Sequence, residues 1–244
     1  MMDRMLQLLA QNKSKGLFRA ELSGDEATIY LYDTIVSDDF WGGVTAISFV
    51  KELMAIKAPV IHLRINSPGG DVFSARAIET AIREHNSEVI AHIDGVAASA
   101  ASYIALAADN IVIAEGAFYM IHKAWSFAMG NADDLLEMAA LLEKVDESLV
   151  TTYAKRTGQA EDQIRDWMRN ETWFSAAEAV EYGFADSVAE DGPSASASIG
   201  WDLSAYNAAP IIRQAQQSAE PAEQDLPKID TGYLQRIAAL ARHM

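Results

Sequence analysis

The 244-residue chain contains no cysteine, which excludes disulfide bridges, thiol catalysis and zinc sites built on cysteine. It is also poor in basic residues, with 19 lysines and arginines against 35 aspartates and glutamates and a net charge of −16. Because phosphate binding needs a basic surface, this charge argues against nucleic acid as a partner. No apolar run approaches the roughly 18 residues of a membrane-spanning helix, so we expect no membrane partner either.

The first residues lack the features of a secretory signal peptide. Asp3 is acidic, and the apolar run that follows it is short. Of all residues, 50% are apolar, which is enough to bury the core of one ordinary domain. Together these features predict a soluble protein of the cytoplasm.

The first half of the chain repeats an order of strand, glycine-containing turn and helix. Apolar alternation predicts strands at 26–36, 58–66 and 88–95, and helical spacing predicts helices at 41–56, 72–85 and 99–110. Two further short strands are predicted around a Glu-Gly turn at 110–122. This order is typical of an α/β domain with a largely parallel sheet.

The chain after these strands is mainly helical. A long helix is predicted at 131–156, with Gly158 as its C-terminal signal, and a short one at 160–168. Another opens at Ser175 with Glu178 in the capping-box position. The long helix carries an apolar stripe that predicts a homo-oligomer. The residues of this stripe are Leu135, Met138, Leu142, Val145 and Leu149.

The composition changes from Asp191 onward. Ser, Ala, Pro and Gln dominate there, as in a linker, and a last short helix is predicted near the C-terminus. We therefore predict an N-terminal segment at 1–25, a folded body at 26–190 and a tail at 191–244. Because such a composition cannot build a core of its own, we expect the tail to be separable from a catalytic site.

The stretch NSPGGD, residues 66–71, follows the second predicted strand. Its two glycines allow the backbone to point N–H groups outward at the start of a helix, which suits an oxyanion or a phosphate. An ordinary strand-to-helix turn explains the stretch as well. It is not a Walker phosphate loop, because no Gly-Lys-Ser/Thr follows.

Ser99 lies where the third predicted strand and Gly95 give way to a helix rich in alanine. The N–H groups and dipole at such a helix start favour negative charge, which suits a serine nucleophile. A serine that lets the helix pack closely on a neighbour is the alternative, because Gly-Val-Ala-Ala-Ser differs from Gly-x-Ser-x-Gly. From these residues alone both interpretations stay open.

His122 ends the segment YMIH and follows Ser99 in the chain. Serine needs a base to take its proton, and histidine is the side chain that most often does so. A third, acidic group normally orients such a histidine. The acidic candidates downstream are Asp166, Glu171 and Asp186.

Taken together, four stretches resemble the ClpP family of serine peptidases in their order and spacing. They are INSPGGDVFSA, GVAASAASYIALAA, YMIHK and SAAEAVEYGFADSV, and the resemblance covers about residues 29–188. It implies an α/β fold of the ClpP/crotonase-like type, a βα superhelical spiral with a protruding handle helix. That helix corresponds to 131–153, and in the family it pairs one ring of subunits with another.

By the same resemblance, Ser99 is the nucleophile, His122 is the base, and the N–H groups of Gly70 and Ala100 form the oxyanion hole. Glu171 stands where the family has the aspartate of its triad. Glutamate serves as the triad acid in some other hydrolases. We therefore expect the Glu171 carboxylate to accept a hydrogen bond from the imidazole, directly or through one water molecule.

Other positions bear on assembly and partners. Asn170 stands where many members carry an arginine that joins contacts between rings, which argues against a standard double-ring barrel. The stretch ETWF and the Ser/Ala/Pro-rich tail resemble the phage-type branch, whose members mature phage heads. The resemblance then implies a ring-forming serine endopeptidase that cleaves polypeptides in the host cytoplasm. Its implied partners are phage capsid or scaffold proteins or an ATP-driven unfoldase, and no metal or other cofactor is expected.

Two alternatives stay open. Glu171 and the long acidic tail are compatible with a catalytically weak or inactive assembly subunit of the same fold. Lys123, next to His122, is compatible with a Ser–Lys enzyme similar to signal peptide peptidases. A serine-reactive fluorophosphonate distinguishes an enzyme, which is labelled at Ser99, from an assembly subunit, which is not.

Overall fold

The structure, a computed structural model, describes residues 4–190 and 200–210. The chain up to Pro210 forms one compact unit, so residues 200–210 belong with the body although their composition groups them with the tail. The short helix predicted near the C-terminus lies outside the described residues. Within the described part, no helix combines the length and the apolar character that a membrane crossing needs.

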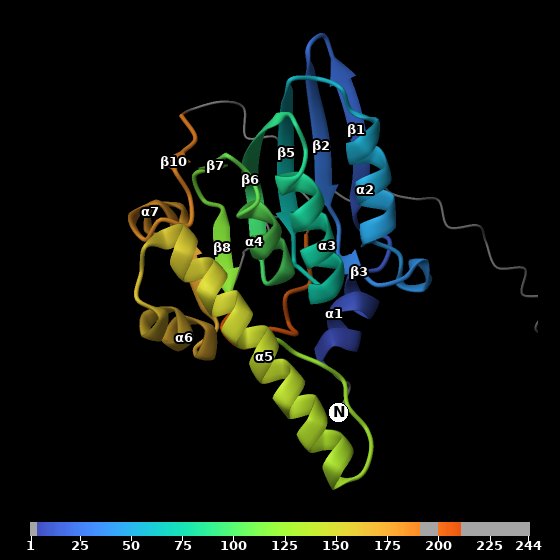
Figure 1. Cartoon of the computed structure of the whole chain (residues 1–244), viewed down its shortest axis with the longest axis vertical. Coiled ribbons are helices and arrows are strands. Elements are labelled where there is room, and N and C mark those ends of the chain that lie inside the picture. Colours follow the sequence, from blue (N-terminus) through green and yellow to red (C-terminus); the bar gives the residue numbers. More distant parts are fainter. Residues whose placement is uncertain (1–3, 191–199, 211–244) are drawn as a thin grey trace, which may run out of the picture. The chain divides into compact units, whose positions relative to one another are not determined.

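An eight-stranded sheet forms the centre of the body (Figure 1). Its strands are β1 (Leu17–Ser23), β2 (Glu26–Tyr32), β5 (Val60–Ser67), β6 (Glu88–Ala98), β7 (Asn110–Ile113), β8 (Phe118–Ile121), β9 (Thr172–Ser175) and β10 (Ser187–Val188). The main path has the order β1-β2-β5-β6-β7-β10, and β8 pairs with both β6 and β9. β1–β2 and β8–β9 are antiparallel and the other pairs are parallel, which confirms the predicted α/β class. A separate pair is formed by β3 (Ile35–Val36) and β4 (Val44–Thr45).

Helices cover the sheet and extend from it. They are α1 (Arg4–Asn12), α2 (Ala46–Ala55), α3 (Val72–Arg83), α4 (Ala100–Ala105), α5 (Ala132–Thr157), α6 (Glu161–Arg169) and α7 (Ala176–Glu181). In Figure 1, α2, α3 and α4 lie over one face of the sheet. The predicted apolar face of α3 makes this contact, with Ala75, Ile78 and Ile82 at most 3% exposed.

Strand β5 illustrates how the sequence pattern fixes the two faces of the sheet. Successive side chains of a strand point to opposite faces. Ile61, Leu63 and Ile65 are at most 1% exposed, whereas His62 and Arg64 between them are partly exposed. One face of the sheet is therefore an apolar core and the other is polar.

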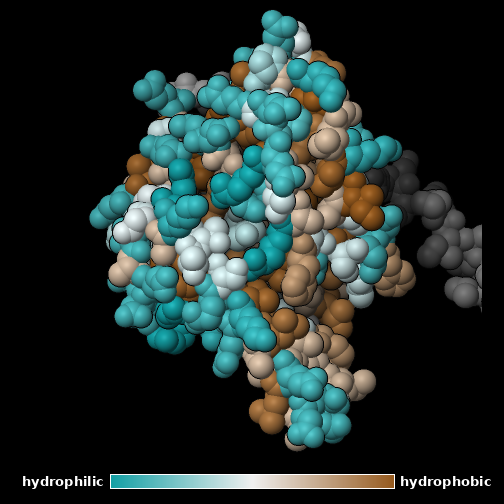
Figure 2. Space-filling model, in the orientation of Figure 1, coloured by the Kyte–Doolittle hydropathy of each residue, from teal (hydrophilic) through white to brown (hydrophobic). Residues whose placement is uncertain are grey.

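Helix α5 is packed on the body along only part of its length. Asn131 caps its start and Gly158 ends it in the left-handed conformation, with a φ of 71°, as predicted. Val145, Leu149 and Val150 in its C-terminal half are buried, whereas its N-terminal half extends away from the body (Figure 1). Figure 2 shows apolar surface on this projecting part. Its most exposed apolar side chains are Leu135, Leu136 and Leu141.

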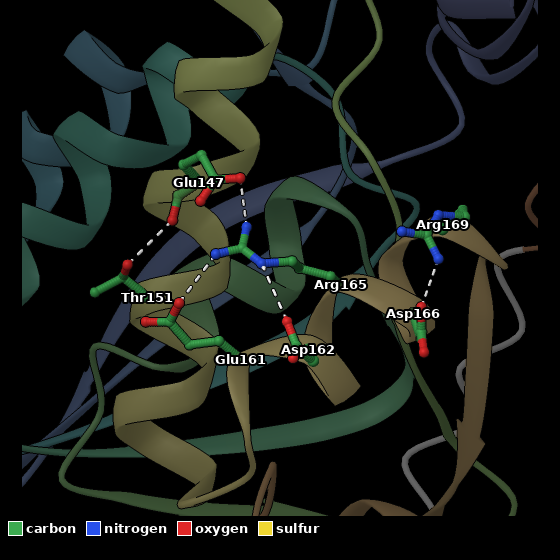
Figure 3. Close-up of polar contacts among 7 residues, drawn as sticks. All are labelled: Glu147, Thr151, Glu161, Asp162, Arg165, Asp166 and Arg169. Carbon is green, nitrogen blue, oxygen red and sulfur yellow. Dashed lines mark hydrogen bonds and ion pairs between the residues drawn. The ribbon is translucent and has the colours of Figure 1, made fainter.

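Arg165 connects α6 to α5 (Figure 3). Its guanidinium pairs with the Glu147 carboxylate of α5 and lies 3.0 Å from the Glu161 carboxylate at the start of its own helix. Thr151 Oγ1 donates to the backbone carbonyl of Glu147 at 3.1 Å. Exposed ion pairs of this kind contribute only about 0–1 kcal/mol each. The pair between Arg165 and Glu147 links α6 to α5, and β9 begins shortly after α6 ends.

Candidate active site

The ends of β6 and β8 bring Ser99 and His122 together. In the parallel pairing of these strands, Ala98 lies opposite Met120. Both segments leave the sheet immediately afterward, so the next residues emerge at the same edge. The Ser99 N–H donates to the Met120 carbonyl at 2.9 Å, which continues the pairing up to the serine. His122 Nε2 lies 2.7 Å from Ser99 Oγ, a hydrogen-bonding distance.

The turn at Ser99 is strained. Its φ of 54° and ψ of −121° lie outside the regions that L residues normally adopt. Such a backbone costs on the order of 1–3 kcal/mol, which the surrounding packing has to compensate. Every residue of the α4 helix that follows is buried. The alanines around the serine therefore make room for a tight strand-to-helix turn that carries the hydroxyl to the cleft.

The loop at 66–71 approaches this turn so closely that only glycine fits at one position. A Cβ at Gly69 would lie 2.5 Å from the Ala98 carbonyl oxygen and 2.9 Å from Ser99 Cβ. The φ of Gly69 is 90°, which also favours glycine. The glycine pair in NSPGGD thus serves the fit between the loop and the serine turn.

Strand β3 holds the same loop from the other side. Ile35 N–H donates to the Gly69 carbonyl, and Asp71 N–H donates to the Ile35 carbonyl, both at 2.9 Å. A Cβ at Gly70 would lie only 1.9 Å from the Ile35 carbonyl oxygen. Gly70 and Ala100, whose N–H groups are the predicted oxyanion hole, both line the cleft. The N–H of Ala100 belongs to the first turn of α4, where a helix has no internal acceptor.

The cleft beside the serine has a volume of about 340 Å³. Apolar side chains from α1, α3, α5 and the chain after β8 form most of its wall. They include Leu8, Val72, Phe73, Trp125, Met138 and Leu142.

Aromatic rings enclose the imidazole of His122. Trp125 and Tyr206 meet it edge to face, with ring centroids 4.4 Å and 5.5 Å away. Burial, and secondarily the positive charge of Arg4, lower the pKa of His122 to about 3. The ring is therefore neutral at physiological pH, and in the tautomer with the proton on Nδ1 its Nε2 accepts a hydrogen bond from the Ser99 hydroxyl.

The carboxylate of Glu171 is bonded away from His122. The β8–β9 ladder ends with the pair Ile121 and Thr172, and His122 and Glu171 are the next residues on the two strands. Glu171 has a φ of 51°, so the extended pairing stops before it. The carboxylate accepts backbone N–H groups from Ala208 at 2.6 Å and from Asn207 at 3.0 Å. Among the described residues it makes no hydrogen bond to His122, so the structure differs here from the contact we expected.

The other two acidic candidates are engaged away from the histidine. Asp166 lies 2.5 Å from the guanidinium of Arg169. Asp186 pairs with Arg156 at 2.6 Å and accepts a backbone N–H at the start of β7. Of the three, Glu171 is the one next to the end of the β8–β9 ladder, where His122 also lies.

Trp125 and Tyr206 are site residues that the sequence analysis missed. Tyr206 lies in WDLSAYNAAP, which was assigned to the tail because of its Ser and Ala content. Three large apolar residues within this stretch, Trp201, Leu203 and Tyr206, are unusual for a linker and were the available signal. Trp125 directly follows YMIHKA, but nothing in its spacing indicates contact with the histidine.

The described residues hold no group of three or more His, Cys, Asp or Glu side chains arranged to bind a metal ion. The chemistry available in the cleft is that of a serine hydroxyl, a neutral imidazole and backbone N–H groups. This set suits acyl transfer, in which a nucleophile, a proton acceptor and an oxyanion site act together.

Comparison with known proteins gives concordant matches. The sequence profile of the family described as Clp protease matches residues 24–192. The ATP-dependent Clp protease proteolytic subunit 2 of Treponema pallidum is 32% identical over 64% of this chain and 78% of its own length. The corresponding subunit of Chlorella vulgaris is 32% identical over 54% of this chain and 66% of its own.

A solved structure matches as well. A mutant ClpP1 from Listeria monocytogenes is similar with a TM-score of 0.59 and 26% identity. The match covers 68% of this chain and 93% of the Listeria protein. The fold predicted from the sequence is thereby confirmed as ClpP-like.

Proposed function

Because the chain belongs to the Clp protease family, it is a serine-type peptidase, and we propose that it cleaves polypeptides internally with Ser99 as nucleophile. His122 is the base in this proposal, and the N–H groups of Gly70 and Ala100 bind the oxyanion. The observation that carries it is the 2.7 Å contact between His122 Nε2 and Ser99 Oγ at the wall of the cleft.

The proposed reaction follows from these positions. Ser99 Oγ attacks the carbonyl carbon of the peptide while its proton passes to His122 Nε2. The carbonyl oxygen becomes an oxyanion, and the N–H groups of Gly70 and Ala100 stabilise it. His122 then gives the proton to the leaving amine, which leaves an acyl group on the serine. Water, activated by the same imidazole, hydrolyses this ester and regenerates the enzyme.

Glu171 is proposed as the third member of the triad. Its place supports this role, because Glu171 and His122 are the residues just beyond the last pair of the β8–β9 ladder, Ile121 and Thr172. A carboxylate there holds the imidazole in the correct tautomer and stabilises the imidazolium that forms during the reaction.

Lys123 is a weaker candidate for the base than His122. Its Nζ lies 3.3 Å from the Asp146 carboxylate on α5, and its side chain is 57% exposed. The histidine, in contrast, contacts Ser99 directly. These contacts favour the Ser–His mechanism over a Ser–Lys mechanism.

We also propose that the chain assembles into a homo-oligomeric ring. Most of the apolar stripe predicted on α5 packs within its own subunit, since Val145 and Leu149 are buried and Met138 and Leu142 line the cleft. The support comes from the exposed apolar side chains on the projecting half, because Leu135, Leu136 and Leu141 are 46%, 67% and 42% exposed. Exposed apolar surface of this kind often marks a protein interface. Sedimentation should show an oligomer for the wild type, and Leu135→Ser with Leu136→Ser should dissociate it. A wild-type monomer of 26.6 kDa would contradict the proposal.

For the biological role we propose the processing of phage head proteins, supported by the resemblance of ETWF and the tail composition to the phage-type branch. The relatives from Treponema and Chlorella are named as subunits of ATP-dependent proteases, which supports an ATP-driven unfoldase as the alternative partner. Two incubations distinguish head processing from work with an unfoldase. The first mixture contains the protein and phage proheads without ATP, and the second contains the protein, an unfoldase and ATP. Cleavage of capsid or scaffold protein in the first mixture supports head processing.

The central test is labelling with a fluorophosphonate together with hydrolysis of fluorogenic peptides. We expect the label on Ser99 and loss of both signals in Ser99→Ala, which removes only one hydroxyl. Lys123→Met is the matched control and should retain labelling and hydrolysis. A folded wild type that neither reacts nor cleaves would support the inactive assembly subunit instead.

A further inference from the structure

Residues 201–210, termed the strap from here on, are bound along α1 (Figure 1). The buried side chain of Asn12 makes two hydrogen bonds with the backbone of Asp202. Its Nδ2 donates to the carbonyl at 2.9 Å, and its Oδ1 accepts the N–H at 2.8 Å. Near the other end of the strap, Arg4 donates to Asn207 Oδ1 at 2.8 Å. The strap is therefore bound to α1 near both of its ends.

The strap is also fixed by apolar packing. Leu203, Ala205 and Tyr206 are at most 7% exposed. The residues next to them, Asp202, Ser204 and Asn207, are polar. The three buried residues belong to a small cluster that is distinct from the main core. The buried residues of the body in this cluster are Leu8, Val96, Ala98 and Met120. This packing holds the strap in a fixed position beside the site.

Tyr206 brings the strap into contact with the catalytic pair. Its ring lies 5.5 Å from the imidazole of His122, and its hydroxyl donates to the Pro68 carbonyl at 2.5 Å. Its side chain forms one wall of the cleft beside Ser99. The strap consequently narrows the space through which a polypeptide reaches the serine.

The strap also holds the carboxylate of Glu171. Its two N–H groups, those of Asn207 and Ala208, donate to the two carboxylate oxygens at 3.0 Å and 2.6 Å. Trp173 Nε1 lies 3.5 Å from the same carboxylate. This acid is therefore satisfied by the strap, and the imidazole of His122 has no anionic partner among the described residues.

We propose that the strap is an autoinhibitory element, whose release frees Glu171 to pair with His122 and opens the approach to Ser99. This inference rests on the proposed function of the three residues. When the strap leaves, the Glu171 carboxylate loses two donors. The imidazole of His122, which lies just beyond the end of the same ladder, can then donate its Nδ1–H to this carboxylate.

The electrostatics of His122 agree with an inhibited state. Burial, and secondarily Arg4, lower its pKa to about 3, which leaves it a weaker base than general-base catalysis near neutral pH requires. The charged and titratable groups around it are Arg4 from α1 and Tyr206 from the strap, with Glu171 just beyond the end of the β8–β9 ladder. Release of the strap exposes the imidazole to solvent and lets the Glu171 carboxylate approach it. Both changes raise the pKa of the imidazole.

The test removes one contact of the strap and leaves every catalytic side chain in place. Ala208→Pro deletes the N–H that lies 2.6 Å from the Glu171 carboxylate. Ala209→Pro, one residue further along, is the matched control. Asn12→Ala loosens the strap from the side of α1 by removing its two bonds to the backbone of Asp202, and Asn12 does not line the cleft. In the full-length protein we measure kcat/KM with a fluorogenic peptide and the rate of fluorophosphonate labelling.

We expect Ala208→Pro to raise both rates about tenfold to a hundredfold, the factor by which loss of a hydrogen bond to a charged group shifts an equilibrium. Asn12→Ala, which removes two neutral hydrogen bonds, should raise them by about fivefold to a hundredfold. Ala209→Pro should match the wild type. Wild-type or lower rates in both loosened variants, with Ser99-dependent hydrolysis and intact circular dichroism, would overturn the autoinhibitory role and leave the proposed function standing. Two results would overturn both the autoinhibitory role and the proposed function. One is peptide hydrolysis that survives Ser99→Ala, and the other is the absence of hydrolysis in the wild type and in every variant.

Discussion

Replacing Gly69 by alanine tests whether the close approach of the 66–71 loop sets the catalytic geometry. The added methyl group would lie 2.5 Å from the Ala98 carbonyl oxygen and 2.9 Å from Ser99 Cβ. Comfortable contacts between carbon atoms are about 3.5 Å or longer, so the loop or the serine turn has to move by roughly 0.6 Å or more. A misplacement of about 1 Å in an active site costs on the order of a hundredfold in rate. We expect kcat/KM to fall by about that factor.

The same change should also destabilise the fold. Overpacking of this kind costs about 1–3 kcal/mol, and a positive φ adds about 1 kcal/mol for a residue with a Cβ. Gly116→Ala separates the two effects, because Gly116 has a φ of 82° and open space around the added methyl. It should lose about 1 kcal/mol in urea unfolding and keep its peptidase activity. If both variants cleave peptides equally fast, the loop does not set the geometry of the site.

Two further predictions concern the acid and the base. Glu171→Gln keeps the shape of the side chain but not its charge, so kcat should fall about a hundredfold or more while KM changes little in steady-state assays. Full activity would remove Glu171 from the triad. The folded-state pKa of His122, about 3, lies below the value of about 6.5 for an unfolded chain. The unfolded chain therefore binds the proton first, and this contribution to stability is complete above about pH 6.5 and lost as the pH falls toward 3. Urea unfolding should show a loss of about 3 kcal/mol between pH 6.5 and pH 4, reduced in His122→Gln. An unchanged pH dependence in that variant would contradict the burial argument.

The longer elements between residues 26 and 190 could be predicted because they leave a local signal. β5 alternates from Val60 to Ile65, α3 has one apolar face, and α5 ends at a glycine with a positive φ. The short strands β3, β4, β9 and β10 were not predicted as strands of their own, because two to four residues are too few to show a period. The cap of α7 was equally clear, since Ser175 and Glu178 form the predicted capping box. Such patterns depend on neighbours within one or two turns of the chain, and a single sequence contains them.

The strap, by contrast, could not be predicted from its own composition. Its stability comes from partners such as Asn12, which is 190 residues away from Asp202. The orientation of the Glu171 carboxylate likewise depends on N–H groups 36 and 37 residues further along. The residues alone left three acids open, and the resemblance to the ClpP family singled out Glu171. It could not indicate which donor that acid meets, because distant segments compete for it.

The two backbone hydrogen bonds between Ile35 and the 66–71 loop have a consequence for how the enzyme can be tuned. They tie the proposed oxyanion site to β3, and the strap adds two side-chain bonds to the same loop, from the Tyr206 hydroxyl to the Pro68 carbonyl and from Trp201 Nε1 to Asn66 Oδ1. In our proposal the oxyanion donors are therefore held mainly by backbone bonds of the body, whereas the residues of the proton transfer depend on the strap. Substitutions around β3 should change the rate by the same factor at every pH. Substitutions in the strap should instead move the acidic limb of the pH profile, so these two parts of the site can vary independently during evolution.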